Sequence, residues 1–265
     1  MKTKYKMIAI DIDGTLLTPE KKIHIQTKED IKKAYEKGVI ICICTGRAYP
    51  AAKRYVDELD LQIPLILYNG SRIISRDGKE IIFNKTIDKE VSNGVFEIIN
   101  MNDGTCCFWK DDALYFNKNN EYTVYYENLT GIKPTIINDY DESLFTNINK
   151  FIWFDTPQNL EFIKNNILND VVGIDCFKSQ SHILEIVPNN VNKGEAIKIL
   201  SNHYNIDISQ VIAIGDDEND KSMIMAAGLG VAMENGKDCV KEVADYITSS
   251  NEENGVGKVI NEFIL

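Results

Sequence analysis

The chain opens with strand-length apolar segments separated by helix-length amphipathic segments, and this alternation limits the possible folds more than any other feature. The apolar segments Met7–Ile12, Val39–Cys44 and Leu65–Tyr68 are each long enough for one buried strand. Between the first two, Thr27 is a candidate N-cap and Gly38 a candidate end of an amphipathic helix. Strand, helix and strand in repetition predict parallel strands joined by right-handed crossovers. We therefore expect an α/β fold with a Rossmann-like, doubly wound parallel sheet.

The alternation is interrupted in the middle of the chain. From about Asn84, the expected strands arrive in consecutive pairs, which is typical of antiparallel ladders. Near Asn192 the alternation of strand and helix resumes. We therefore predict one core domain made of residues 1–83 and 188–265, with residues 84–187 inserted into it as an α+β domain.

Charge and hydropathy exclude several classes of protein. The 265 residues include 29 Lys and Arg against 40 Asp and Glu, and this net charge of −11 disfavours nucleic-acid binding, which needs clustered cations. The apolar segments are too short to span a membrane, so we expect no membrane partner. Asp11 and Asp13 interrupt the first apolar segment too early for a signal peptide. We therefore expect a cytoplasmic protein whose six cysteines stay reduced.

Two carboxylates stand at the end of the first predicted strand. Asp11 and Asp13 are two residues apart and precede Gly14. Residues at this spacing leave a strand on one face, and in open parallel sheets ligands bind at the carboxyl ends of the strands. The alternative is an ordinary turn, because Asp and Gly are common turn residues.

Hydrogen-bond donors follow the second predicted strand. Thr45, Gly46 and Arg47 offer a hydroxyl, an unobstructed backbone and a guanidinium, which suit phosphate oxygens. The alternative is a strand-to-helix turn with Arg47 in solvent. Lys193 stands at the start of a predicted helix, where a cation opposes the helix dipole unless an anion is near. Its alternative is a solvated surface lysine.

A third polar segment follows a later apolar strand. Asp216, Asp217, Glu218, Asn219 and Asp220 place four acids and one amide in five positions. Carboxylates this close repel one another unless a cation or a proton is bound. Oxygen ligands of this kind suit Mg²⁺, which binds through a few carboxylates, waters and substrate phosphate. The alternative is an acidic helix start that the helix dipole favours.

Taken together, these segments resemble the haloacid dehalogenase superfamily, and within it the Cof-type phosphatases with a C2B cap (the IIB subclass). The matching segments, in the family's order, are DIDGTLL from Asp11, TGR from Thr45, VNKG from Val191 and GDDENDKSMIMAAG from Gly215. The pair Asn69-Gly70 and the tail from VAMENG to NEENGVG also resemble family features. In one minor departure, Asn235-Gly236 stands where the family usually has Asn-Ala.

The resemblance implies a role for each matching residue. Asp11 would be the nucleophile that forms an aspartyl-phosphate, and Asp13 would be the general acid and base. Asp11, the main-chain carbonyl of Asp13, and Asp216 would hold Mg²⁺, with Asp220 orienting the site. The groups expected to bind the phosphate or the substrate are Thr45, Gly46, Arg47, Lys193 and Asn219.

The expected function is therefore a Mg²⁺-dependent phosphatase acting on small phosphorylated metabolites, with sugar phosphates as the leading class. A phosphomutase of sugar phosphates is one alternative, and a non-catalytic phospholigand-binding protein on the same scaffold is another. The sequence does not predict the oligomeric state.

By the same resemblance, residues 84–187 form a cap that selects the substrate. Trp109, Trp153, Lys178 and His182 are candidate specificity residues, although strand aromatics more often belong to a core. The insert carries 8 basic and 16 acidic residues, a net charge of −8, which leaves −3 of the total −11 for the rest of the chain. An acidic cap favours a substrate with one phosphate and a neutral or polar body.

Overall fold

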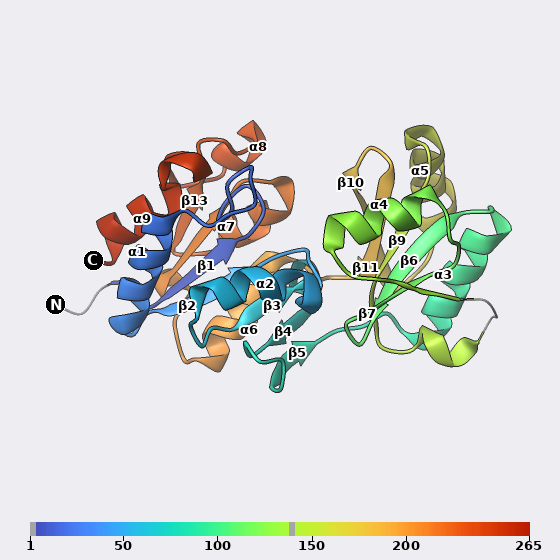
Figure 1. The fold of residues 1–265 in the computed structure, drawn as a ribbon, viewed down its shortest axis with the longest axis horizontal. Coiled ribbons are helices and arrows are strands. Elements are labelled where there is room, and N and C mark those ends of the chain that lie inside the picture. Colours follow the sequence, from blue (N-terminus) through green and yellow to red (C-terminus); the bar gives the residue numbers. More distant parts are fainter. Residues whose placement is uncertain (1–3, 138–140) are drawn as a thin grey trace. The chain divides into compact units, whose positions relative to one another are not determined.

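The computed structural model of the protein describes residues 4–137 and 141–265, and it divides into two compact units (Figure 1). The first unit contains the described residues up to Arg47, together with Ala52–Asn84 and Asn192–Leu265. The second contains Ala48–Ala51 and the described part of Lys85–Val191. Within the described ranges, no helix is both long and apolar enough to cross a membrane.

An eight-stranded sheet forms the centre of the first unit, in the order β14-β13-β12-β1-β2-β3-β4-β5. The strands from β14 to β3 pair in parallel, while β3, β4 and β5 pair antiparallel. Their bounds are β1 (Met7–Asp11), β2 (Ile40–Cys44), β3 (Leu65–Leu67), β4 (Arg72–Ile74), β5 (Ile81–Asn84), β12 (Val211–Gly215), β13 (Leu229–Ala232) and β14 (Tyr246–Ile247). This sheet confirms the predicted α/β fold class.

Helices cover this sheet on both faces. Every residue of β1 is buried, as expected of a strand packed on two sides. On one face, Met7 and Ala9 of β1 share a core with Ile197 and Met223, which come from α6 and α7. The helices of this unit are α1 (Ile25–Glu36), α2 (Tyr49–Leu59), α6 (Lys193–His203), α7 (Lys221–Ala226), α8 (Asp238–Lys241) and α9 (Gly255–Phe263).

The start of α1 differs from the sequence prediction. The N-cap is His24, whose side chain accepts a hydrogen bond from the Gln26 amide, and Thr27 lies inside the helix. Thr27 is buried, and its hydroxyl donates to Asn254 Oδ1 at 2.5 Å, just before α9 begins. The prediction was wrong because the partner of Thr27 lies 227 residues away in the sequence, and no local pattern reveals it.

The second unit is built on a six-stranded sheet in the order β10-β11-β9-β6-β7-β8. All of its pairs are antiparallel except β7 with β8. The strands are β6 (Thr105–Lys110), β7 (Ala113–Phe116), β8 (Thr135–Ile136), β9 (Ile148–Phe154), β10 (Ile174–Gln180) and β11 (Ile183–Pro188). The helices are α3 (Lys89–Met101), α4 (Glu121–Thr130) and α5 (Pro157–Ile163), the last continued by a π-helical turn at Lys164–Leu168.

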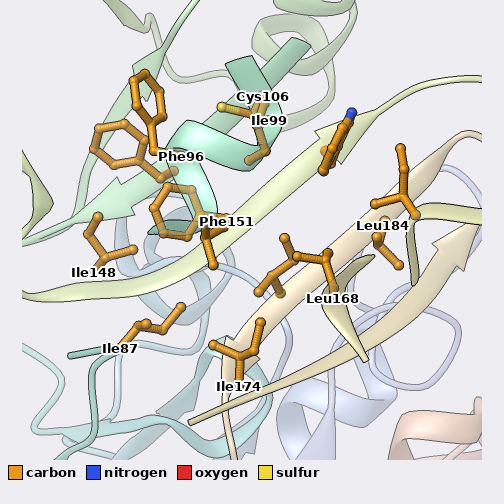
Figure 2. Packing of buried hydrophobic residues seen from close by; sticks show 14 of the residues in the cluster. Ile87, Phe96, Ile99, Cys106, Ile148, Phe151, Leu168, Ile174 and Leu184 are labelled. Atoms are coloured by element: carbon orange, nitrogen blue, oxygen red, sulfur yellow. The ribbon is translucent and has the colours of Figure 1, made fainter. Parts of the chain in front are cut away.

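The second unit has its own apolar core, shown in Figure 2. Phe96 and Ile99 of α3 pack against Phe151 of β9 and Cys106 of β6 in this core. In β6 and β11 the core residues are two positions apart, as for Leu184 and Ile186, which is the period of a β-strand. All residues of β9 are buried, so its two faces are both covered.

The four candidate specificity residues of the insert have different environments. Trp153 is a member of this core, and Trp109 is also fully buried, with its ring nitrogen donating to the Tyr126 hydroxyl. Lys178 and His182 are half-buried, and the His182 ring packs edge-on against the ring of Tyr125. The two tryptophans are therefore core residues in this structure.

Candidate active site

The polar segments of the first unit meet because their strands are neighbours. β1 lies between β2 and β12, and these three parallel strands end at the same edge of the sheet. Asp11 is the last residue of β1, Thr45 follows β2 directly, and Asp216 follows β12 directly. The strand that follows β1 in the chain, β2, lies on one side of β1, and the later strand β12 lies on its other side. The order of strands therefore reverses at β1, and α/β sheets bind ligands at such a switch point.

Three carboxylates cluster at this edge. Asp11, Asp216 and Asp220 each place one carboxylate oxygen within 4.8 Å of the other two. Burial, followed by the charge of Asp220, raises the pKa of Asp11 well above its ordinary value. Burial is also the main cause that raises the pKa of Asp216 to about 7. Both shifts express the cost of holding negative charges together away from water.

Lys193 is the cation that offsets these charges. It is the first residue of α6, and its side chain is fully buried. Its Nζ lies 2.6 Å from Asp11 Oδ1 and 2.6 Å from Asp220 Oδ1. Although burial works against the charged amine, the two carboxylates raise the pKa of Lys193 above its ordinary value. The alternative of a solvated surface lysine is therefore wrong, and the anions nearest to Lys193 are the protein's own carboxylates.

Asp220 holds the loop after β12 in place. Its Oδ2 accepts hydrogen bonds from the main-chain N–H groups of Asp216 at 2.9 Å and Asp217 at 3.0 Å. A Cβ at Gly215 would lie 2.4 Å from the Cβ of Asp220, so only glycine fits there. Asp220 therefore joins the loop to Lys193 through hydrogen bonds to both.

Asp216 is held from the opposite side by the loop after β1. The Thr15 hydroxyl donates to Asp216 Oδ1 at 2.7 Å. Gly14 has a left-handed φ of +85°, and a Cβ there would lie 2.2 Å from Asp216 Oδ2. Glycine is required at this position for both its backbone conformation and its size.

Asp13 is bound by two cations. Arg47 donates from Nε and Nη2 to the two carboxylate oxygens, each at 2.7 Å, and Lys21 Nζ lies 2.9 Å from Oδ1. Although burial acts in the opposite direction, the hydrogen bonds from Arg47 help to lower the pKa of Asp13 to about 2. The Arg47 guanidinium also lies over the Tyr55 ring, 5.2 Å from its centre. Arg47 is thus partly buried against Asp13, and not free in solvent.

The remaining predicted residues lie around the loop after β2. Thr45 is buried, and its hydroxyl accepts a hydrogen bond from the Arg47 main-chain N–H at 3.1 Å. Gly46 lies beside the carboxamide of Asn69, which in turn accepts a hydrogen bond from the Asn219 side chain at 3.0 Å. The Asn69 main-chain N–H also donates to the carbonyl of Thr45 at 3.0 Å, so Asn69 contacts all three predicted residues.

Several supporting residues could not be identified from the sequence motifs alone. Asn235 donates to the carbonyl of Gly14 at 2.8 Å, and Asn251 donates to the carbonyl of Leu17 at 2.6 Å. Asn235 Oδ1 also accepts from the Asn251 main-chain N–H. Both segments belong to the tail that resembled the family, but nothing in them indicates that they hold the loop after β1.

The donor set fits a divalent cation. The carboxylates of Asp11 and Asp216 provide hard oxygen ligands, and a cation between them would offset the buried negative charge that, with burial as its main cause, raises both of their pKa values. Asp220 belongs to the same group of oxygens, but its hydrogen bonds to Lys193 and the loop backbone already engage it. The geometry therefore agrees with a site made mainly by the first two carboxylates.

Comparisons with known proteins agree with the fold and with the class of enzyme. The model of a family described as haloacid dehalogenase-like hydrolases matches residues 8–260. A 5-amino-6-(5-phospho-D-ribitylamino)uracil phosphatase of Bacillus subtilis (strain 168), YwtE, is 33% identical, with 98% of each chain covered. The putative phosphatase YxeH of the same organism is 32% identical over 98% of this chain and 99% of its own length.

Solved structures give the same result. The crystal structure of a haloacid dehalogenase-like hydrolase from Bacteroides thetaiotaomicron superimposes with a TM-score of 0.90 at 28% identity. That match covers 97% of this chain and 98% of the other. The chain belongs to the family of haloacid dehalogenase-like hydrolases. The resemblance to this superfamily that the sequence motifs indicated is confirmed, and so is the prediction of a phosphatase-type enzyme.

Proposed function

We propose that the protein is a Mg²⁺-dependent phosphatase that hydrolyses phosphate monoesters of small metabolites through an aspartyl-phosphate. The observation that carries this proposal is the contact between the buried carboxylate of Asp11 and the ammonium of Lys193, 2.6 Å apart, beside Asp216. A carboxylate at the end of a strand can act as nucleophile when nearby cations neutralise the charge on the phosphoryl group that it attacks.

The reaction proceeds in two displacements. Asp11 attacks phosphorus, the ester P–O bond breaks, and the leaving alkoxide takes a proton from Asp13. Water then attacks the aspartyl-phosphate, Asp13 accepts the proton of that water, and inorganic phosphate is released with Asp11 restored. In this structure Arg47 and Lys21 hold Asp13 as a carboxylate. The acid role therefore requires that Arg47 turn from Asp13 toward the bound phosphoryl group.

Other groups supply most of the rate. Uncatalysed hydrolysis of phosphate monoesters needs an acceleration of up to about 10²¹-fold, and one general acid provides only about 10²–10⁴. Asp11, Asp216 and the main-chain carbonyl of Asp13 would hold Mg²⁺, which would neutralise charge on the transferring phosphoryl oxygens. Thr45, Gly46, Arg47, Lys193 and Asn219 would bind or orient those oxygens.

The proposed substrates are sugar phosphates and related polyol phosphates. Relatives named 5-amino-6-(5-phospho-D-ribitylamino)uracil phosphatases act, by that name, on a phosphorylated ribityl chain. We include this compound among the candidates, because its ribityl phosphate is a polyol monoester like an open-chain sugar phosphate. The insert, residues 84–187, would select among them, and its net charge of −8 disfavours bodies that carry further phosphates.

The test is a screen of phosphate release. We expect turnover of hexose and pentose phosphates, of the ribityl compound or of both, and weak activity on nucleoside triphosphates and bisphosphates. Chelation of the divalent metal should abolish turnover. Asp11→Asn should lower turnover to background, whereas Asp60→Asn, at a fully exposed position, should leave it unchanged. Unchanged turnover in Asp11→Asn would exclude the covalent route.

The screen also separates the two alternatives. A phosphomutase returns the phosphoryl group to the sugar, so a hexose phosphate would yield its isomer and little inorganic phosphate. A non-catalytic phospholigand-binding protein would bind the same compounds and release no phosphate from any of them.

A further inference from the structure

A left-handed turn follows β3 at the same edge of the sheet as the candidate active site. Tyr68, Asn69 and Gly70 have consecutive φ values of 52°, 58° and 108°. For residues with a Cβ this conformation costs about 1–2 kcal/mol each, so it persists only where the surroundings impose it. Tyr68 is fully buried and Asn69 nearly so, which shows that the turn is packed into the protein.

The turn is bonded to the loop after β2. The Tyr68 main-chain N–H donates to the carbonyl of Arg47 at 3.1 Å, and the Asn69 N–H donates to the carbonyl of Thr45 at 3.0 Å. These two bonds hold the backbone of Asn69 against the Thr45–Arg47 segment, for which the proposed function is phosphate binding.

The side chain of Asn69 lies between two proposed phosphate ligands. Its Oδ1 accepts a hydrogen bond from Asn219 Nδ2 at 3.0 Å. On the other side, a Cβ at Gly46 would come within 2.9 Å of Asn69 Oδ1 and 3.2 Å of its Nδ2. Real Cβ atoms essentially never approach to less than 3.0 Å, so the carboxamide occupies the space that a side chain at position 46 would need.

We propose that Asn69 is a positioning residue of the phosphate site, which aligns the Asn219 carboxamide with the backbone of Thr45 and Gly46. In this view Gly46 lacks a side chain because the Asn69 carboxamide must lie against it. The strained backbone places Asn69 between the loops after β2 and β12, which come from strands separated by β1 in the sheet. The inference rests on the proposed phosphatase function.

A mutant cycle of Gly46→Ala and Asn69→Gly tests this role. Each single variant should lower kcat/KM by between about 10-fold and 100-fold, the scale expected when a contact is misplaced by about 1 Å. Glycine at position 69 frees the space beside position 46, so the double variant should be no worse than Asn69→Gly alone. If the two losses multiply, Gly46 acts independently of Asn69 and the inference is overturned.

Two controls separate positioning from stability. Asn205 is an exposed asparagine with a φ of 54°, so Asn205→Gly relieves the same kind of backbone strain away from the site and should leave kcat/KM unchanged. If Gly46→Ala does not fold, Asn219→Ala replaces it in the cycle, again with no added loss expected in the Asn69→Gly background. A multiplicative loss in that second cycle would overturn the inference too.

Phosphate affinity distinguishes this inference from the proposed function. Calorimetric titration with inorganic phosphate and Mg²⁺ should show weaker binding in each single variant and no further loss in the double variant. If the wild type releases no phosphate from any monoester, the proposed function fails while the titration still tests Asn69. If the wild type is active and the phosphate affinities of all variants equal its own, the positioning role is wrong.

Discussion

At the residue scale, the two cations on Asp13 make its proposed acid role testable. Asp13→Asn keeps the size of the side chain but cannot donate a proton from a carboxylic acid. With an alkyl phosphate such as a hexose 6-phosphate, we expect kcat to fall by about 10²–10⁴-fold. With p-nitrophenyl phosphate the loss should be much smaller, because that leaving group departs without protonation. Steady-state kinetics on both substrates gives the comparison.

An equal loss on the two substrates would contradict the acid role, and would place the effect of Asp13 in the hydrolysis of the shared aspartyl-phosphate or in the ordering of Arg47. Lys21→Met is a useful companion variant, because Lys21 contacts the same carboxylate from an exposed position. It should weaken the hold on Asp13 while Arg47 keeps its two hydrogen bonds.

The carboxylates around Lys193 predict how stability depends on pH. The pKa of Asp216 in the folded protein is about 7, above its ordinary 3.8, so the folded state binds the proton more tightly than the unfolded state. The metal-free protein should therefore lose stability as pH rises from about 4 toward about 7. The pKa of Asp11 is shifted in the same direction. The pKa of Asp13 is lowered, so the stability that its carboxylate contributes is lost only in acid, as pH falls toward about 2.

Mg²⁺ should compete with these protons. We expect the Tm increase on adding Mg²⁺ to be larger at pH 8 than at pH 5.5, because the site must lose its protons before it binds the cation. Asp216→Asn should remove most of the increase, whereas Asp238→Asn, exposed at the start of α8, should keep it. A Tm increase that is the same at both pH values would contradict a carboxylate metal site.

The sequence predicts which residues carry charge at the site better than it predicts their partners. Asp11, Lys193 and Asp220 all belong to recognisable motifs, and the structure joins them directly. The contact of Arg47 with Asp13 was missed, because a guanidinium after a strand suits phosphate and a neighbouring carboxylate equally well. Only the side-by-side packing of β1 and β2 brings the two together.

At the element scale, long buried strands were predictable and short exposed ones were not. The strands β1 and β2 are within one residue of their predicted bounds, since an apolar run flanked by polar residues marks a buried strand. The two-residue strand β8 has one exposed and one half-buried residue, so no apolar run marks it. The helix α5 ends at Ile163 and is continued by a π-helical turn from Lys164 to Leu168, a change that no periodicity in the sequence indicates.

The loop after β1 gives a prediction at this scale. Gly14→Ala places a Cβ on a left-handed residue and directly against Asp216. We expect a loss of stability of about 1–3 kcal/mol from the backbone strain, together with a large loss of activity. Gly38→Ala is the matched control, because Gly38 has a φ of +82° and open space where its Cβ would stand. It should show a similar loss of stability, measured by urea unfolding, and no loss of kcat.

At the scale of the whole molecule, each of the two units has its own apolar core. The sequence predicts the change from parallel to antiparallel strands, because strands arrive in consecutive pairs through most of the insert. In the first unit, consecutive strands pair antiparallel only from β3 to β5. The pairing of β8 with β7, and the core that Phe96 and Phe151 share, depend on contacts between distant segments and could not be read from local pattern. Charge is unevenly divided as well, since the insert carries most of the net −11.

The core of the second unit supports the last prediction. Phe151 is fully buried in contact with Phe108 and other core residues, so Phe151→Ala should cost about 3–5 kcal/mol of local stability. Phe162→Ala is the control within the same unit, because 60% of the Phe162 side chain is already exposed. Hydrogen exchange by mass spectrometry should locate the faster exchange of Phe151→Ala in residues 85–191 and leave β1, β2 and β12 protected. Because each unit has its own apolar core, faster exchange spread evenly over both would mean that they unfold as one cooperative body.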